Sequence, residues 1–384
     1  MHDIIKDNIY MENPFSKLPK LTDFFKSKEV SAIGIDIGSS FIKVVQLKKK
    51  GGKAILETYG ELALGPYANL VVGQMTNLSA EKLAEAITDI LKESNITTKN
   101  AALSIPFSAS LVSMIQLPKL SEGQLDSIIP IEARKYIPVP IGEVSIDWWV
   151  VPRPNEYEGE EDGETPDIKN QKIDVLIAAI HSETVSKYQD VVNRVQLENI
   201  FFEIEMFSTI RSTFGHDMKL IMVLDMGAGT TKLSIVEYGV VKISHSVGRG
   251  SQDITVSLSK SLGVGMEEAE KIKREHGLIE QNGNNKIIET ISLSTDYIFS
   301  EVNRVLLNYE RKFGKTIGKI VLTGGGVLLP GFREKAKEML KAEVVYGDPF
   351  SKVEAPAFLE GLLKEAGPEF AVAIGLALRK LQDV

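Results

Sequence analysis

Cysteine is absent from this sequence of 384 residues, and histidine occurs only five times. Without cysteine there is neither a disulfide framework nor a thiolate-ligated metal, and scattered histidines do not form a zinc motif. A chain without thiols is compatible with the reducing cytoplasm, where we expect the protein to reside. Its stability must then come from hydrophobic packing rather than from covalent or metal cross-links.

Long apolar runs and an excess of positive charge are also missing. The most apolar stretch, at 370–378, is far shorter than the roughly 20 residues that span a bilayer. With 44 basic and 52 acidic residues the net charge is −8, which argues against a nucleic-acid-binding surface. Residues 1–29 show no secretory pattern, so we expect a flexible N-terminal extension there. We predict no nucleic-acid partner and only indirect association with membranes.

The sequence does contain one glycine-rich motif twice, at residues 33–45 and 224–235. Each copy has an apolar strand, an aspartate, a turn of Gly and Ser or Thr, and a second apolar strand that carries a lysine. The turn of such a hairpin exposes backbone N–H groups to an anion, and the aspartate can hold a hydrated Mg²⁺ through water. The residues concerned are Asp36, Gly38, Ser39, Ser40 and Lys43 in the first copy, and Asp225, Gly227, Gly229, Thr230, Thr231 and Lys232 in the second.

A third glycine motif follows an apolar strand late in the chain. Gly324, Gly325 and Gly326 come directly after residues 320–323, and a helix is predicted to begin near Arg333. Three glycines let the backbone approach a base or a phosphate without an intervening Cβ. Neither the Walker P-loop pattern nor the glycine spacing of the dinucleotide fingerprint is present. The three motifs together predict that ATP or ADP binds, with Mg²⁺, between two repeated halves.

Strand and helix patterns divide the chain into two similar halves separated by an insertion. The first half is predicted to contain strands at 31–37, 41–48 and 54–64, a helix at 79–92, and strands at 101–106 and 111–117. The second half repeats this order from about residue 220. The insertion begins with a helix at about 121–136, which Pro130 is expected to kink or split. Its acidic run at 154–172 is predicted to be a disordered loop, because such a composition cannot bury a core.

Together these motifs resemble the actin, Hsp70 and sugar-kinase superfamily. Within it the chain is similar to the PilM family of type IV pilus assembly, a relative of the division protein FtsA. The resemblance covers about residues 30–382, and its specific stretches are 34–43, 132–138, 248–255, 268–273 and 322–326. It implies an α/β fold of the actin-like (ribonuclease H-like) type, duplicated into core lobes 1A and 2A with smaller subdomains 1C and 2B. The implied boundaries are 30–118 and 197–212 for 1A, 119–196 for 1C, 213–262 and 319–384 for 2A, and 263–318 for 2B.

The resemblance also assigns roles in an ATP site. Glu270 and Lys273, one helical turn apart, are expected to bind the ribose hydroxyls. The connecting helices are expected at 202–212 and 370–379, and near the first of them Glu203 and Glu205 are the two candidates for activating water. Because neither glutamate is clearly placed for that role, we expect hydrolysis to be slow or absent. The glycines expected to line the site beyond the turns and the triple glycine are Gly34, Gly248 and Gly250.

A protein partner is implied as well. In PilM proteins the short N-terminal cytoplasmic peptide of the inner-membrane protein PilN lies in a groove between the first lobe and the 1C insertion. Pilus motor ATPases, and other copies of the chain in an oligomer or ring, are further expected partners. These contacts would place the protein at the inner membrane through its partners. The residues expected to contact the peptide are Ile105, Phe107, Val112, Ile115, Ile128, Tyr136 and Ile137.

Two alternatives stay open at this point. An FtsA-like division protein would share the fold, although this sequence ends at Val384 without the extended tail and terminal amphipathic helix that FtsA uses at the membrane. An ATP-dependent small-molecule kinase on the same fold would need a polar substrate cleft with a catalytic aspartate. The insertion is instead apolar on one helix face and continues into the apolar residues 137–141, which favours a protein partner.

Overall fold

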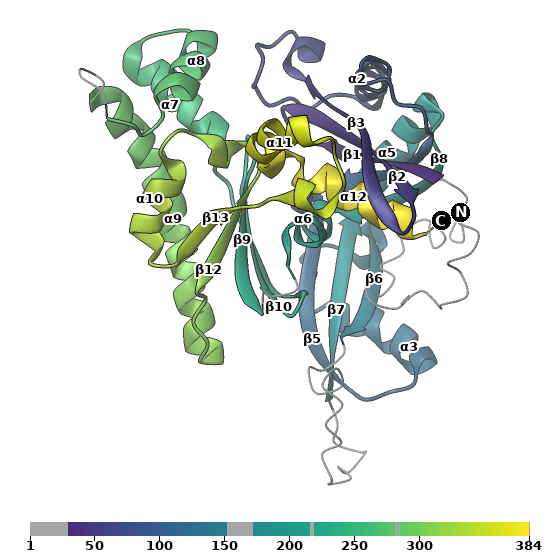
Figure 1. Cartoon of the computed structure of the whole chain (residues 1–384). Helices are drawn as coiled ribbons and strands as arrows, with labels where there is room; N and C mark the ends of the chain where they lie inside the picture. The colour runs from purple at the N-terminus through teal and green to yellow at the C-terminus, as the bar shows by residue number, and fades with distance from the viewer. Residues whose placement is uncertain (1–29, 152–171, 216–218, 281–282, 284, 384) are drawn as a thin grey trace.

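The computed structural model describes residues 30–151, 172–215, 219–280, 283 and 285–383 (Figure 1). The predicted N-terminal extension at 1–29 and the predicted acidic loop at 154–172 lie outside the described residues, apart from Lys172 at the start of a strand. None of the helices within the described ranges combines the length and the hydrophobicity needed to cross a bilayer.

Two five-stranded sheets with the same topology form the two lobes, in the orders β3-β2-β1-β4-β8 and β11-β10-β9-β12-β13. In each, three antiparallel strands are followed by two strands that pair in parallel. The predicted actin-like duplication is confirmed, and each copy of the motif is the hairpin at the middle of its sheet. The strands are β1 Val30–Ile37, β2 Phe41–Lys50, β3 Lys53–Ala63, β4 Asn100–Ile105, β8 Glu198–Ile204, β9 Leu220–Met226, β10 Thr231–Glu237, β11 Val240–Val247, β12 Lys319–Thr323 and β13 Glu343–Tyr346.

A third sheet of three strands, in the order β5-β7-β6, forms the insertion. Its strands are β5 Ser110–Pro118, β6 Val144–Val151 and β7 Lys172–His181. The prediction that residues 111–117 belong to lobe 1A, with the boundary at 118, is wrong, because β5 pairs with β7 and not with the first sheet. Sequence alternation identifies a strand but does not reveal its partner. The remaining subdomain boundaries stay predictions.

Helices cover both faces of the first sheet and one face of the third. On the first sheet, α2 and α5 pack against residues such as Ile35, and α12 packs on the opposite face against residues such as Val45. On the third sheet α3 packs against Ile115, and it runs through Pro130 as one helix rather than two. The helices are α2 Ala80–Glu93, α3 Glu122–Ala133, α5 Ser182–Val195, α6 Glu205–Thr213, α7 Ser251–Leu262, α8 Met266–His276, α9 Asn285–Phe313, α10 Phe332–Leu340, α11 Glu360–Ala366 and α12 Ala371–Gln382.

The two connecting helices, α6 and α12, cross between the lobes (Figure 1). The predicted start of the first connecting helix at residue 202 is wrong. Residues 202–204 belong to the end of β8, which continues to Ile204, and α6 begins at Glu205. Phe201 and Phe202 alternate between two hydrophobic clusters, which is the period of a strand. At the crossing, the absence of a side chain on Gly375 lets α12 lie directly on the Ser208 backbone.

Candidate functional site

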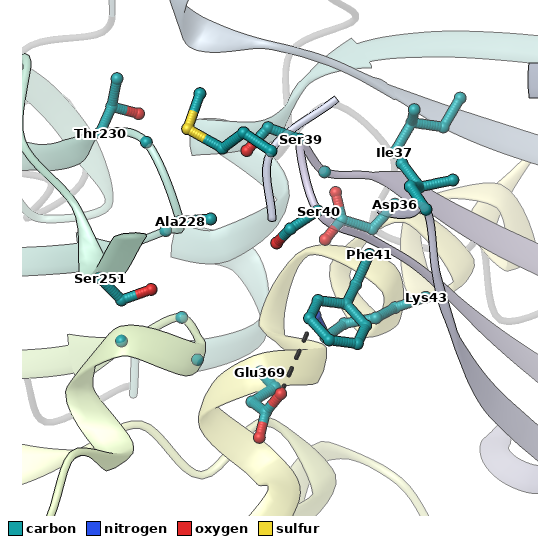
Figure 2. A pocket seen from close by; sticks show the side chains of 18 of the residues that line it. Asp36, Ile37, Ser39, Ser40, Phe41, Lys43, Ala228, Thr230, Ser251 and Glu369 are labelled. Carbon is teal, nitrogen blue, oxygen red and sulfur yellow. Dashed lines mark ion pairs between the residues drawn. The ribbon is translucent and has the colours of Figure 1, made fainter. Parts of the chain in front are cut away.

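A cavity of about 660 Å³ lies between the lobes, and all three glycine motifs line it. In Figure 2, Ser39 and Ser40 from the β1–β2 turn lie on one side, and Ala228, Thr230 and Ser251 lie on the other. The predicted residues that line this cavity are Asp36, Gly38, Ser39, Ser40, Lys43, Glu205, Asp225, Gly227, Gly229, Thr230, Lys232, Glu270, Lys273, Gly324, Gly325 and Gly326. The two repeated turns therefore face one shared space.

The first turn is held in place from behind by β4. Gly38 N–H donates to the Phe41 carbonyl at 3.0 Å and closes the turn. The Ser104 hydroxyl accepts from Ile37 N–H at 2.8 Å and donates to Asp36 Oδ1 at 3.1 Å, so it fixes the aspartate at the end of β1. Burial raises the pKa of Asp36 to about 6, although Lys43 opposes the shift.

The second turn is held by the start of α7. Gly227 N–H donates to the Thr230 carbonyl at 2.9 Å, which repeats the closure of the first turn. The N–H groups of Ser251 and Gln252 donate to the carbonyls of Gly227 and Ala228 at 3.0 and 2.9 Å. The helix N-terminus therefore satisfies the turn carbonyls and leaves the opposite side of the turn toward the cavity.

Carboxylates neutralise the lysine of each motif. Lys232 lies 2.6 Å from Glu205 and 3.5 Å from Asp225. Lys43 lies 2.9 Å from Glu61 and 3.9 Å from Glu369, the latter drawn as a dashed line in Figure 2. Burial alone would lower the pKa of both lysines. The neighbouring carboxylates outweigh burial, so the pKa of each lysine is raised above its usual value. An anion in the cavity would therefore be bound mainly by backbone N–H groups and hydroxyls.

Glu270 and Lys273 project from α8 as a buried ion pair at 2.6 Å rather than a surface pair. Lys273 also donates to Thr255 Oγ1 at 2.9 Å, and Arg274 lies 2.8 Å from Glu270. Burial lowers the pKa of Lys273; burial alone would raise the pKa of Glu270, but its cationic and hydroxyl partners lower it. Both side chains line the cavity, and Lys273 also donates to the Ser251 carbonyl at 3.3 Å, so the pair joins α8 to α7 at the cavity wall.

The structure separates the two glutamate candidates. Glu203 does not line the cavity; it forms a double hydrogen bond with Arg211 at 2.7 and 2.6 Å and also accepts from Ser208. The prediction that Glu203 could activate water is wrong, because both of its carboxylate oxygens accept hydrogen bonds from the Arg211 guanidinium. Glu205 lines the cavity and accepts from Phe107 N–H and Lys232, both at 2.6 Å.

Four residues predicted to bind ATP lie outside the cavity lining: Gly34, Thr231, Gly248 and Gly250. A Cβ on Gly34 would lie 2.7 Å from Ala377 N, so this glycine lets β1 pack under α12. Thr231 is buried and donates to the Arg249 carbonyl at 2.9 Å. A Cβ on Gly250 would collide with the backbone of residues 227 and 228, whereas one on Gly248 would meet nothing within 4 Å. Gly34, Thr231 and Gly250 therefore have packing or hydrogen-bonding roles behind the cavity wall, and the assignment of these four residues to nucleotide binding stays a prediction.

Several lining residues were missed by the sequence analysis. They come from the segment between β3 and α2, from the helices α5, α7 and α8, and from the turn before α12. A signal existed for Ser251, the first residue of α7 after Gly250, where a helix N-terminus begins. The missed residues include Gly73, Met75, Thr76, Asn77, Tyr188, Ser251, Arg274 and Glu369.

The residues present also fit a hydrated divalent cation. Asp36 and Asp225 pair with the lysine-bearing strands at equivalent positions of the two hairpins, and both line the cavity. Within the described part of the chain, no group of three or more His, Cys, Asp or Glu side chains converges to hold a bare ion. Two carboxylates facing a polar cavity suit an ion that keeps most of its water shell, as Mg²⁺ does.

The residues expected to contact a peptide do not form one groove. Ile105, Ile115 and Ile137 are buried in hydrophobic clusters, so they stabilise the core instead. Val112 of β5 packs in a cluster with Val240 of the second lobe. Ile128 belongs to α3, which packs on the opposite face of the third sheet against Ile115, because side chains alternate along β5. Phe107 is half-buried against the first lobe, and Tyr136 is 46% exposed. The seven residues predicted to contact the peptide therefore cannot all line one groove.

The chain is similar to proteins of known families along most of its length. The sequence profile of the family described as Type IV pilus assembly protein PilM matches residues 34–381. FtsA of Rhizobium meliloti is 29% identical over 178 residues, and the match spans 40% of this chain but only 39% of that protein. FtsA of Neisseria meningitidis is 24% identical over 349 residues, with 82% of each chain covered.

Solved structures give the same fold. A PilM–PilN type IV pilus biogenesis complex superposes with a TM-score of 0.75 at 24% identity, covering 92% of this chain and 99% of that one. MreB 5 of Spiroplasma citri bound to AMPPNP superposes with a TM-score of 0.51 at 12% identity, covering 92% and 97%. These likenesses confirm the actin-like fold, and the profile match decides among its families. The chain belongs to the PilM family of type IV pilus assembly proteins.

Proposed function

We propose that this protein is a nucleotide-binding scaffold that holds ATP or ADP with Mg²⁺ between its lobes and docks the N-terminal cytoplasmic peptide of a PilN-type protein. The observation that carries the proposal is the pair of equivalent hairpin turns, each with its aspartate, facing one cavity opposite the triple glycine. Through its partners it would lie on the cytoplasmic side of the inner membrane and link the membrane complex to the pilus motor ATPases.

Within this cavity the phosphates would lie between the two turns. Ser39, Ser40 and Thr230 line it beside the turn N–H groups, so they would donate to phosphate oxygens. Asp36 and Asp225 would hold the hydrated Mg²⁺, which balances phosphate charge. Glu270 and Lys273 would bind the ribose hydroxyls, and residues 324–326 would contact the adenosine.

Slow or absent hydrolysis follows from the surroundings of Glu205. One oxygen of this carboxylate accepts from Phe107 N–H and the other from Lys232. Both carboxylate oxygens are therefore already engaged by donors of the protein itself, so neither is held ready to orient an attacking water. The geometry therefore supports nucleotide as a structural or switching ligand.

Nucleotide affinity should depend on Asp225. Titration with a fluorescent ATP analogue is expected to show Mg²⁺-dependent binding that Asp225→Ala weakens by about tenfold or more, because the variant removes one of two carboxylates for the cation. Asp190→Ala is the matched control, since Asp190 is exposed on α5 and pairs only with Arg194 among the contacts shown. Equal affinity in wild type and Asp225→Ala would refute the site.

Peptide docking is proposed at the insertion subdomain. β6 is an edge strand of the third sheet, and its described pairing is with β7 only. An extended peptide gains main-chain hydrogen bonds from such an edge and specificity from nearby side-chain pockets. Tyr136, which follows α3, is the predicted contact residue that remains well exposed. We therefore place the peptide against this subdomain, with Tyr136 as its contact.

A PilN-type peptide rich in Asn, Leu and Pro should bind the wild type, and Tyr136→Ala should weaken binding by about fivefold or more, since exposed tyrosines are frequent anchors. Tyr297→Ala is the matched control, because Tyr297 is 52% exposed on α9, away from the third sheet. The measurement is fluorescence anisotropy of labelled peptide with ATP, with ADP and without nucleotide. Binding that ignores Tyr136 would refute this placement, and a wild type that ignores the peptide in all states would refute the partner.

A further inference from the structure

The segment between β3 and α2 joins the two lobes at the cavity. Residues 70–77, here called the strap, contribute Gly73, Met75, Thr76 and Asn77 to the cavity lining. Thr76 N–H donates to the Ser39 carbonyl of the first turn at 2.8 Å. The preceding residue turns to the other lobe, where Met75 N–H donates to Gln252 Oε1 on α7 at 2.7 Å. Two adjacent peptide groups therefore link the first turn to the helix that supports the second.

Side-chain packing reinforces this bridge. A Cβ on Gly229 would lie 2.5 Å from Met75 Sδ, so the thioether rests directly on the second turn. At Gly73, whose φ is +87°, a Cβ would lie 3.4 Å from the Glu270 carboxyl carbon, so the strap backbone also reaches the ion pair of α8. The outer side of the strap faces solvent, because Leu70 is 41% and Val72 53% exposed. The strap thus lies across both turns and against the α8 pair.

We propose that the strap is a third wall of the nucleotide site, held shut by Met75 and Gln252, so that nucleotide exchanges only when this contact opens. The inference rests on the proposed nucleotide binding. The strap touches the second lobe through one neutral hydrogen bond, one thioether contact and one glycine, and contacts of this kind are individually weak. Segments that close a site in this way commonly set the rate of ligand release. Met75 and Gln252 are positioning residues in this arrangement.

Exchange kinetics test the proposal. In stopped-flow mixing with a fluorescent ATP analogue, Gln252→Ala and Met75→Ala are expected to raise both uptake and release rates about tenfold, while the dissociation constant changes less than about threefold. Met75→Leu should restore nearly wild-type rates, because it keeps an apolar side chain of similar size. Gln189→Ala on α5 is the control, since Gln189 is exposed and bonds Asn193. Unchanged rates would overturn the proposal, as would a raised dissociation constant with an unchanged release rate.

A cross-link provides the opposite perturbation. Because the chain contains no cysteine, a Met75→Cys, Gln252→Cys double variant can be joined selectively with a reducible bismaleimide. Cross-linking after loading should slow release of the analogue at least about 100-fold, and reduction of the linker should restore it. Release at the uncross-linked rate would overturn the strap as a barrier. A wild type that takes up no analogue would instead overturn the nucleotide site itself, and with it this inference.

Discussion

Replacement of Gly375 by valine is expected to lower the free energy of unfolding by about 3 kcal/mol or more. A Cβ at this position would lie 2.8 Å from Ser208 Cα and closer still to its carbonyl group. These are backbone atoms, so no side-chain rotation relieves the collision, and α6 and α12 must separate. The same two helices join the lobes, which means that their separation also disturbs the cavity between the lobes.

The control for this change is Gly361→Val in α11. A Cβ at Gly361 would meet nothing within 4 Å. The control therefore makes the same glycine-to-valine change in a helix without the steric collision. Urea unfolding followed by circular dichroism should show a large fall in midpoint for Gly375→Val and little change for Gly361→Val. Equal midpoints for Gly375→Val and wild type would show that the crossing tolerates a side chain.

Glu203→Ala is expected to cost about 3–5 kcal/mol of stability, because it leaves a buried guanidinium without its carboxylate. The Glu203 side chain is 7% exposed and Arg211 17%, and the two are joined by a double hydrogen bond. Arg211 also donates to the Gly375 carbonyl at 3.1 Å, so the pair fastens β8 and α6 to α12. The lost stability would therefore come from the contact between α6 and α12, which is the same contact that Gly375→Val disturbs.

Two comparisons make the Glu203 prediction specific. Glu198→Ala removes an exposed carboxylate from the same strand. That carboxylate lies 3.6 Å from the Lys99 ammonium in a surface ion pair, so its loss should leave the thermal midpoint nearly unchanged. Nucleotide affinity, measured on Glu203→Ala at a temperature where it stays folded, should match wild type because Glu203 does not line the cavity. A Glu203→Ala protein with wild-type stability and impaired ATP turnover would restore this residue as a catalytic candidate.

The candidate site was predictable to the extent that it is built from local turns. Asp36 and Asp225 follow apolar strands, and each precedes a turn that β pairing must close, so sequence spacing alone brings the turn and its carboxylate together. Gly34 shows the limit of this argument. It belongs to the same motif, yet β1 is covered by α12 at that residue, and only the packing of a helix about 340 residues later reveals it.

Contacts between segments without a motif were not predictable at all. The strap and Glu369 enter the cavity because the chain folds back across both lobes, and nothing in their local sequence marks them. The residues expected to line a peptide groove do not share one surface for a related reason. Val112 and Ile128 were both expected to contact the peptide, but β5 pairs with β7, and Val112 and the helix α3 that carries Ile128 lie on opposite faces of the third sheet.

The sequence by itself determined the duplicated halves, the three glycine motifs and the family, because these depend on short-range spacing and on the alternation of strands. The tertiary structure alone decided which of the two glutamates, Glu203 or Glu205, faces the cavity and which pairs with Arg211. It also decided that β5 belongs to the insertion. In both cases the deciding partner is distant in sequence or lies on a neighbouring element, and its position is set by packing rather than by local preference.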